Sequence, residues 1–164
     1  MFSNQGKIRI VLGTMTFGKQ TDSAAATRMV QLYLNNGGFS FDTAFVYADG
    51  KSEEILGRIL KSFNREKLYI ATKAHPMVMG NLSPEAITEQ LETSLRRLAT
   101  DYVDLFYLHQ PNLSTPIEIT LEACARLHEQ GMFRELGLSN YASWQVADIW
   151  HICQREGWPV PTVY

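Results

Sequence analysis

The sequence has no run of 18 apolar residues, so we expect no transmembrane helix. Its N-terminus, MFSNQGKIRI, also lacks the long apolar stretch of a signal peptide. Neither charge sign dominates, because 15 basic side chains are balanced by 17 acidic ones. Since nucleic-acid binding needs a basic face, we expect neither a nucleic-acid nor a membrane partner. The short basic cluster at 61–67 (KSFNREK) is predicted to be a solvated helix end.

Cysteine is also scarce, and no CxxC motif is present. The two cysteines, Cys124 and Cys153, fall on the apolar stripes of predicted helices, so we expect reduced core thiols and a cytoplasmic protein. The four histidines are dispersed, at His75, His109, His128 and His151. Because HExxH is absent as well, no metal site is predicted.

Three common active-site motifs are missing. The absence of GxSxG argues against a hydrolase, and the absence of GxGxxG argues against a Rossmann dinucleotide site. The segment LGTMTFGKQ has Gly13, Gly18 and Lys19 at P-loop spacing, but Gln20 replaces the required Ser or Thr. Any bound dinucleotide must therefore be held in another way.

The chain's 164 residues, of which 45% are hydrophobic, predict one globular domain over residues 1–164. Strands are predicted at 8–12, 39–43, 68–73, 103–109, 135–139 and from 161 to 164. Several are nearly continuous apolar runs, such as VDLFYL, as expected for a parallel sheet covered on both faces. The spacing of about 30 residues matches a βαβ unit.

Helical patterns separate these strands and have recognisable ends. The first helix begins after Thr21 or Asp22, and the second follows Ser52, with acidic residues in a first turn that favours negative charge. The third opens with the cap sequence SPE at 83–85, and TPIE at 115–118 fits a capping box for the fourth. The fifth covers about 143–157.

Two parallel α/β architectures compete for this pattern. An open doubly wound sheet, as in a flavodoxin-type binding module, fits the length well. An eight-stranded β/α barrel usually needs about 250 residues. Length alone favours the open sheet, whereas the chemistry of the strand ends favours the barrel.

Polar side chains gather at the carboxyl ends of the predicted strands. In a parallel β/α fold these ends lie on one face, which is where ligands bind. The side chains are, in chain order, Thr14 and Met15, Asp42, Tyr47, Lys73, His109, and Ser139 with Asn140. Each alone is more often structural than functional, but four complementary groups on three successive strand ends are hard to ascribe to packing.

Aspartate, tyrosine, lysine and histidine together suit the reduction of a carbonyl. A tyrosine hydroxyl has an ordinary pKa of about 10, and a nearby ammonium favours its loss of a proton. The aspartate would hold that ammonium, and a neutral histidine would orient the substrate oxygen. The hydride must come from a cofactor, because no side chain can supply it.

These residues lie in segments that resemble the aldo-keto reductase superfamily, especially its aflatoxin-aldehyde and succinic-semialdehyde reductases. The segments are LGTMTFG, FDTAFVYADGKSEEILG, IATKAHP, VDLFYLHQP, ELGLSNYASWQVADI and WPVPTVY. The resemblance implies an NADPH-dependent reductase of aldehydes or ketones. It also implies that this chain is the N-terminal portion, about five and a half β/α units, of a (β/α)8 TIM barrel.

The resemblance also implies a role for each site residue. Tyr47 looks like the general acid, Lys73 like the residue that lowers its pKa, and Asp42 like the partner of Lys73 near the nicotinamide ribose. His109 resembles the residue that orients the carbonyl. The residues that resemble cofactor contacts are Ser139 and Asn140 for the carboxamide, and Thr14 and Met15 lining the cofactor.

Family members are roughly twice as long as this chain. Their glutamine after the sixth strand, stacking tyrosine, 2′-phosphate pocket and C-terminal loop would lie beyond Tyr164. We therefore expect weak NADPH binding by the chain alone, and self-association or a homodimer through open sheet edges. The alternative is a non-catalytic truncated isoform, or a relative of channel subunits, that acts through protein partners.

Overall fold

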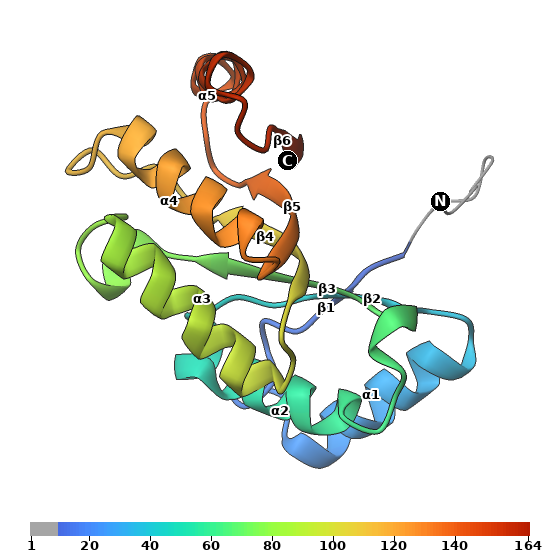
Figure 1. The fold of residues 1–164 in the computed structure, drawn as a ribbon. Coiled ribbons are helices and arrows are strands. Elements are labelled where there is room, and N and C mark those ends of the chain that lie inside the picture. Colours follow the sequence, from blue (N-terminus) through green and yellow to red (C-terminus); the bar gives the residue numbers. More distant parts are fainter. Residues whose placement is uncertain (1–9) are drawn as a thin grey trace.

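The computed structural model describes residues 10–164, which form one parallel sheet with helices along it (Figure 1). The strands are β1 (Leu12–Gly13), β2 (Ser40–Asp42), β3 (Tyr69–Ala74), β4 (Val103–Leu108), β5 (Phe133–Leu138) and β6 (Pro161–Val163). The helices are α1 (Ser23–Asn35), α2 (Lys51–Leu60), α3 (Pro84–Leu98), α4 (Ile117–Glu129) and α5 (Ser143–Glu156). The expected first strand, 8–12, lies partly outside the described residues, whereas the other predicted strands overlap the observed ones.

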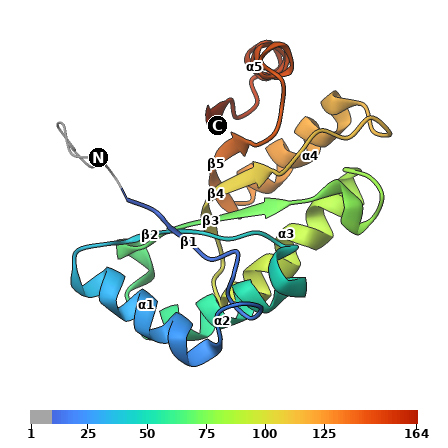
Figure 2. The same ribbon diagram turned by 180° about the vertical axis from the view of Figure 1, so that it is seen from behind.

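The order of the strands decides between the two architectures. Each strand pairs in parallel with the next one in the chain, from β1 through β6. A doubly wound sheet would instead contain a reversal of strand order, so the open-sheet alternative is wrong. The sheet also curls. The evidence is that Gly13 of β1 and Val163 of β6, from its two edge strands, line the same cavity of about 340 Å³. The chain is therefore a partial β/α barrel, with α1 to α4 outside its curve (Figures 1 and 2).

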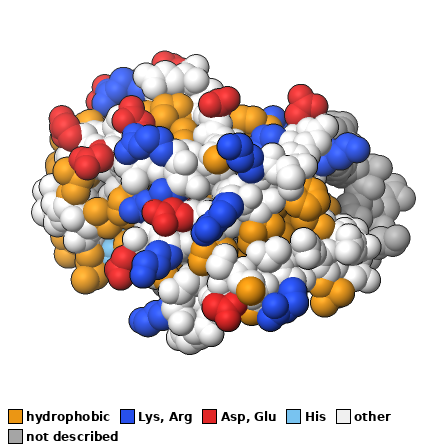
Figure 3. Space-filling model, turned by 90° about the horizontal axis from the view of Figure 1, so that it is seen from below, with side chains coloured by type: hydrophobic (Ala, Val, Ile, Leu, Met, Phe, Trp, Pro, Cys, Tyr) orange, Lys and Arg blue, Asp and Glu red, His pale blue; other side chains and the backbone are white. Residues whose placement is uncertain are grey.

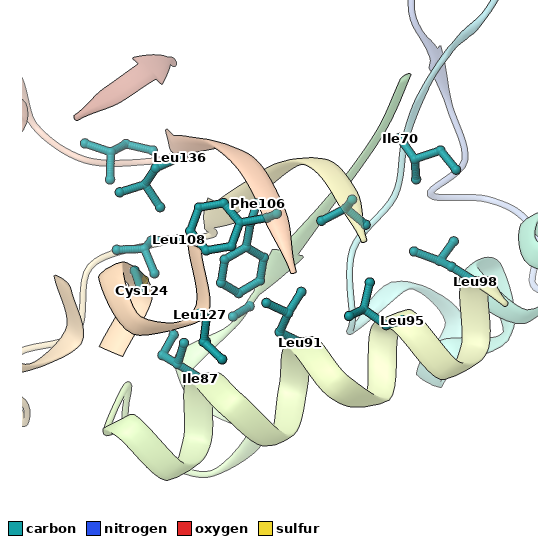
Figure 4. Close-up of a cluster of buried hydrophobic side chains, with 14 of the residues drawn as sticks. Ile70, Ile87, Leu91, Leu95, Leu98, Phe106, Leu108, Cys124, Leu127 and Leu136 are labelled. Atoms are coloured by element: carbon teal, nitrogen blue, oxygen red, sulfur yellow. The ribbon is translucent and has the colours of Figure 1, made fainter. Parts of the chain in front are cut away.

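The core lies between the sheet and its helices, as α3 shows. Ser83 caps this helix by accepting a hydrogen bond from the Ala86 amide, and Pro84 occupies the first helical position. Figure 4 shows the apolar stripe of α3 turned toward side chains from the strands and α4. The labelled stripe residues are Ile87, Leu91, Leu95 and Leu98. Cys124 and Cys153 are buried and free, as the sequence predicted.

The start of α4 differs from its prediction. The helix begins at Ile117 with Pro116 as its cap residue and has no side-chain cap. Thr115, the expected capping hydroxyl, instead accepts a hydrogen bond of 3.4 Å from the Leu82 amide. The capping box is therefore wrong, because a contact with a distant loop takes the oxygen that the box would have used.

Two charged residues at predicted helix ends have structural partners. Glu53 is fully buried although it lies in the first turn of α2. Arg65, from the basic cluster, donates to the Asp104 carboxylate and to the Tyr102 and Leu68 carbonyls. Long-range partners override the local preference of both side chains for water.

None of the described helices is long and apolar enough to cross a membrane. On the face seen from below, basic and acidic side chains are interspersed rather than separated (Figure 3). This mixture agrees with the nearly balanced charge count of the sequence.

We predict that the 164-residue chain self-associates at micromolar concentration. In the described sheet β1 and β6 each have a strand neighbour on one side only, and a strand edge exposes unpaired backbone groups that can pair with another chain. Ile10 and Val11, which lead into β1, are exposed and apolar as well. Sedimentation velocity would measure the association. A monomer with a sharp, reversible thermal transition would contradict it.

Candidate active site

Three neighbouring strands deliver the central side chains of the site. Asp42 is the last residue of β2, Lys73 lies near the end of β3, and His109 follows β4 directly. The strands are parallel and in register, with Asp42 opposite Ala71 and Lys73 opposite Tyr107. Their carboxyl ends therefore meet at one rim of the sheet.

The Lys73 ammonium is buried and held by two partners. Its side chain forms an ion pair with Asp42 and donates a hydrogen bond of 2.7 Å to the Thr43 carbonyl. Only 7% of Lys73 is exposed, so these partners replace water around the charge. The ammonium is consequently fixed in place rather than free to extend into solvent.

Tyr47 and His109 complete the cluster around this ammonium. Lys73 Nζ lies 5.0 Å from the centroid of the Tyr47 ring. The Tyr47 and His109 rings meet edge to face, with centroids 5.8 Å apart. The structure thus brings together the four side chains that the sequence placed on three successive strand ends.

His109 is arranged to be neutral. The pKa of His109 is lowered from 6.5 to about 4. The largest cause is burial, followed by electrostatic repulsion from Lys73 and then from His75. Its Nδ1 is buried and has no hydrogen-bond partner among the described residues. A neutral imidazole has one donor and one acceptor nitrogen, so it can donate a hydrogen bond to an oxygen without carrying charge.

We predict that His109 titrates near pH 4 and that Lys73→Met raises this midpoint. The positive charge of Lys73 opposes protonation of the imidazole, so its removal makes protonation easier. NMR titration of the histidine ring signals would measure both midpoints, with Lys61→Met as an exposed control that leaves the midpoint unchanged. A wild-type midpoint at the ordinary value of 6.5 would contradict the predicted environment.

Ser139 and Asn140 follow β5 and form a small polar pair. Asn140 has a positive φ of 63°, and its Nδ2 donates to the His109 carbonyl at 2.8 Å and to Ser139 Oγ at 3.0 Å. These bonds leave Asn140 Oδ1 as an acceptor and the Ser139 hydroxyl as a donor. A primary carboxamide offers the complementary acceptor and donor, so the pair fits the amide end of a nicotinamide.

The two residues assigned from the first strand differ in exposure. Thr14 is fully buried, and its hydroxyl donates to the Asp42 carbonyl at 3.1 Å and lies 2.8 Å from Ser52 Oγ. Met15 is 62% exposed. Thr14 therefore supports the strand end that carries Asp42, and Met15 is the side chain available to a ligand.

Sequence reasoning missed two residues near this cluster, one beside His109 and one bound to the residue before Lys73. The His75 ring lies 4.9 Å from the His109 ring, edge to face. Its position two residues after Lys73, which puts both on the same side of a strand, was the available signal. Glu53 is the second, and its spacing of three and seven residues from Leu56 and Leu60 places it on the buried stripe of α2.

Comparison with known proteins places this chain in a family. The profile of the Aldo/keto reductase family matches residues 9–163. Over 160 residues the chain is 49% identical to aflatoxin B1 aldehyde reductase member 2 of Homo sapiens, covering 96% of this chain and 45% of that protein. It is also 34% identical to a probable voltage-gated potassium channel subunit beta of Arabidopsis thaliana, covering 94% of this chain and 51% of that protein.

A solved structure agrees with these sequence matches. The fold is similar to a thermostable aldo-keto reductase crystallised with the inhibitor epalrestat, with a TM-score of 0.82 and 31% identity. The match covers 98% of this chain and 59% of that one. The chain spans about half the length of the curated relatives that it matches. On its sequence, its strand order and these likenesses, the chain belongs to the aldo/keto reductase family.

Proposed function

We propose that this chain carries the proton-donating site of an NADPH-dependent reductase that converts aldehydes and ketones to alcohols. The observation that carries the proposal is the ion pair between buried Lys73 and partly buried Asp42, set against Tyr47 and His109. Family membership and the similarity to an aflatoxin aldehyde reductase support an oxidoreductase.

Each side chain then has one task at the substrate carbonyl. Neutral His109 donates a hydrogen bond that orients the carbonyl oxygen, and Tyr47 gives that oxygen its proton. The Lys73 ammonium stabilises the negative charge left on Tyr47, while Asp42 holds the ammonium in place. A bound nicotinamide cofactor would provide the hydride, which no side chain of this chain can supply.

Three residues of this chain would hold the nicotinamide end of that cofactor. The free acceptor of Asn140 and the free donor of Ser139 match its carboxamide, and the exposed side chain of Met15 is available beside it.

The buried free thiols Cys124 and Cys153 support a cytoplasmic location, where thiols stay reduced.

The proposal is tested by joining this chain to the C-terminal portion of the human aflatoxin aldehyde reductase, a protein we call the completed barrel. We expect it to oxidise NADPH when an aldehyde is added, with turnover on the order of 1 s⁻¹ or more. NADH in place of NADPH tests the choice of cofactor. A folded completed barrel that oxidises neither cofactor with a panel of aromatic and aliphatic aldehydes would contradict the proposal.

The likeness to potassium channel β subunits favours one second candidate. In this alternative the chain keeps the site residues but acts by associating with protein partners. Stable association with a full-length relative, together with no hydride transfer by the completed barrel, would support this alternative over the reductase.

A further inference from the structure

An ion pair between Arg97 and buried Glu53 contacts the segments that carry Tyr47 and Lys73 but takes part in none of the assigned roles. Arg97 Nη1, from α3, lies 3.1 Å from Glu53 Oε2, from α2, and Glu53 is fully buried. Well-packed apolar residues of similar volume often stabilise a fold as well as a buried ion pair does. Stability alone therefore does not explain why this position holds an Arg97–Glu53 ion pair, and the contacts of the pair suggest another role.

Arg97 binds the segment that leads to Tyr47. Its Nη1 also donates a hydrogen bond of 3.1 Å to the carbonyl of Phe45, two residues before Tyr47. The guanidinium carbon lies 4.4 Å from the centroid of the Phe45 ring. Both the backbone and the side chain of Phe45 are thus fixed by a single arginine.

The turn that follows Tyr47 is strained and needs such support. Ala48 has φ 51° and Asp49 has φ 54°, a left-handed conformation that is unfavourable for residues with a Cβ. Gly50 continues the turn at φ 90°, and a Cβ there would lie 2.3 Å from the Arg97 guanidinium carbon. Arg97 therefore packs directly against the turn, and such conformations persist only where surrounding contacts determine them.

Glu53 connects the same ion pair to the strand of Lys73. The Thr72 hydroxyl donates a hydrogen bond of 2.6 Å to Glu53 Oε1, and Thr72 precedes Lys73 on β3. One carboxylate therefore accepts from Arg97 with one oxygen and from β3 with the other. The Glu53 carboxylate therefore connects the turn of Tyr47, through Arg97, to the strand of Lys73, through Thr72.

We propose that Arg97 and Glu53 are positioning residues that set the separation of Tyr47 from Lys73. They touch neither substrate nor cofactor and act through the Phe45 segment and Thr72. The inference rests on the proposed function for its catalytic consequence. Its structural part, the fixing of the Tyr47 turn, can be measured without any turnover.

The structural part is tested by amide hydrogen exchange in the chain itself. In Arg97→Met we expect the amides of Phe45 and Tyr47 to exchange about 10-fold faster or more, because their segment loses its anchor. The Leu105 and Leu136 amides, in the central strands, should change far less. Arg96→Met is the matched control, because Arg96 is the exposed neighbour on the same helix and should leave all four amides unchanged.

The catalytic part is tested in the completed barrel. We expect Arg97→Met to lower kcat by about 100-fold, the scale expected for a small misplacement of a reacting group, with KM changed much less. Arg97→Lys should restore part of the loss, since lysine keeps the charge but not the planar group over Phe45. Glu53→Gln, which keeps the size of the side chain, provides a second variant if Arg97→Met does not fold.

The possible outcomes separate the inference from the proposed function. Faster exchange across the whole sheet, or kcat unchanged in folded Arg97→Met and Glu53→Gln, would overturn the positioning role. If the wild-type completed barrel shows no hydride transfer, the proposed function fails. Local acceleration at Phe45 and Tyr47 would still support the structural anchor in that case.

Discussion

Tyr47→Phe in the completed barrel should lower turnover by about 100- to 10,000-fold, the usual contribution of a positioned proton donor. The substitution removes one hydroxyl and leaves the ring that packs near Lys73 and His109. Cofactor binding should stay within about 2-fold, because the residues proposed to contact the carboxamide are unchanged. Steady-state kinetics and NADPH titration would measure the two effects separately.

Tyr107→Phe provides the matched control for this prediction. The Tyr107 ring also lies near the Lys73 ammonium, 5.5 Å from Nζ, but it projects from within β4 rather than from the turn beyond β2. Its loss of a hydroxyl should change turnover only slightly. Equal losses in the two variants would mean that proximity to Lys73, and not proton donation by Tyr47, explains the effect.

Asp104→Ala should lower the free energy of unfolding by about 3–5 kcal/mol, the cost of breaking a buried charge network. Asp104 is 3% exposed and accepts hydrogen bonds from Arg65 at 2.7 Å, the Ile70 amide at 2.9 Å and Arg134 at 3.2 Å. Because Asp104 lies at the start of β4, opposite the proposed site, turnover of the folded protein should remain. Denaturant unfolding of the completed barrel would measure the loss.

Glu122→Ala tests whether burial is the reason for that cost. Glu122 and Arg126 form an ion pair of 2.7 Å one turn apart on α4, and both side chains are largely exposed. Such pairs contribute only about 0.3–0.5 kcal/mol. Similar losses in Glu122→Ala and Asp104→Ala would contradict the account of the buried network.

The sequence was informative where local chemistry agrees with the final structure. Ser83 caps α3 and Pro84 takes its first position, as their sequence predicted, and the apolar runs form the predicted central strands. The parallel arrangement then placed Asp42, Lys73 and His109 on one rim, because equivalent strand ends share a face. Length alone favoured the open sheet, whereas the strand-end chemistry and the family resemblance favoured the barrel, which the order of the strands confirms.

Sequence reasoning failed where distant contacts decide a residue's environment. Glu53 was correctly placed in the first turn of a helix, where the dipole favours its charge, but its burial depends on Arg97 and Thr72, which are far along the chain. The left-handed turn at Ala48 and Asp49 has no sequence signal either, because neither residue prefers that conformation enough to predict it.

The most direct test of the account follows the hydrogen that the reaction transfers. The completed barrel would be given NADPH carrying deuterium in place of both hydrogens at nicotinamide C4, together with an aldehyde, and the alcohol would be analysed by mass spectrometry and NMR. The account predicts an alcohol with one deuterium on its carbinol carbon, formed by the wild type and nearly lost in Tyr47→Phe. An alcohol without deuterium, or deuterium transfer that is equally fast without the Tyr47 hydroxyl, would contradict it.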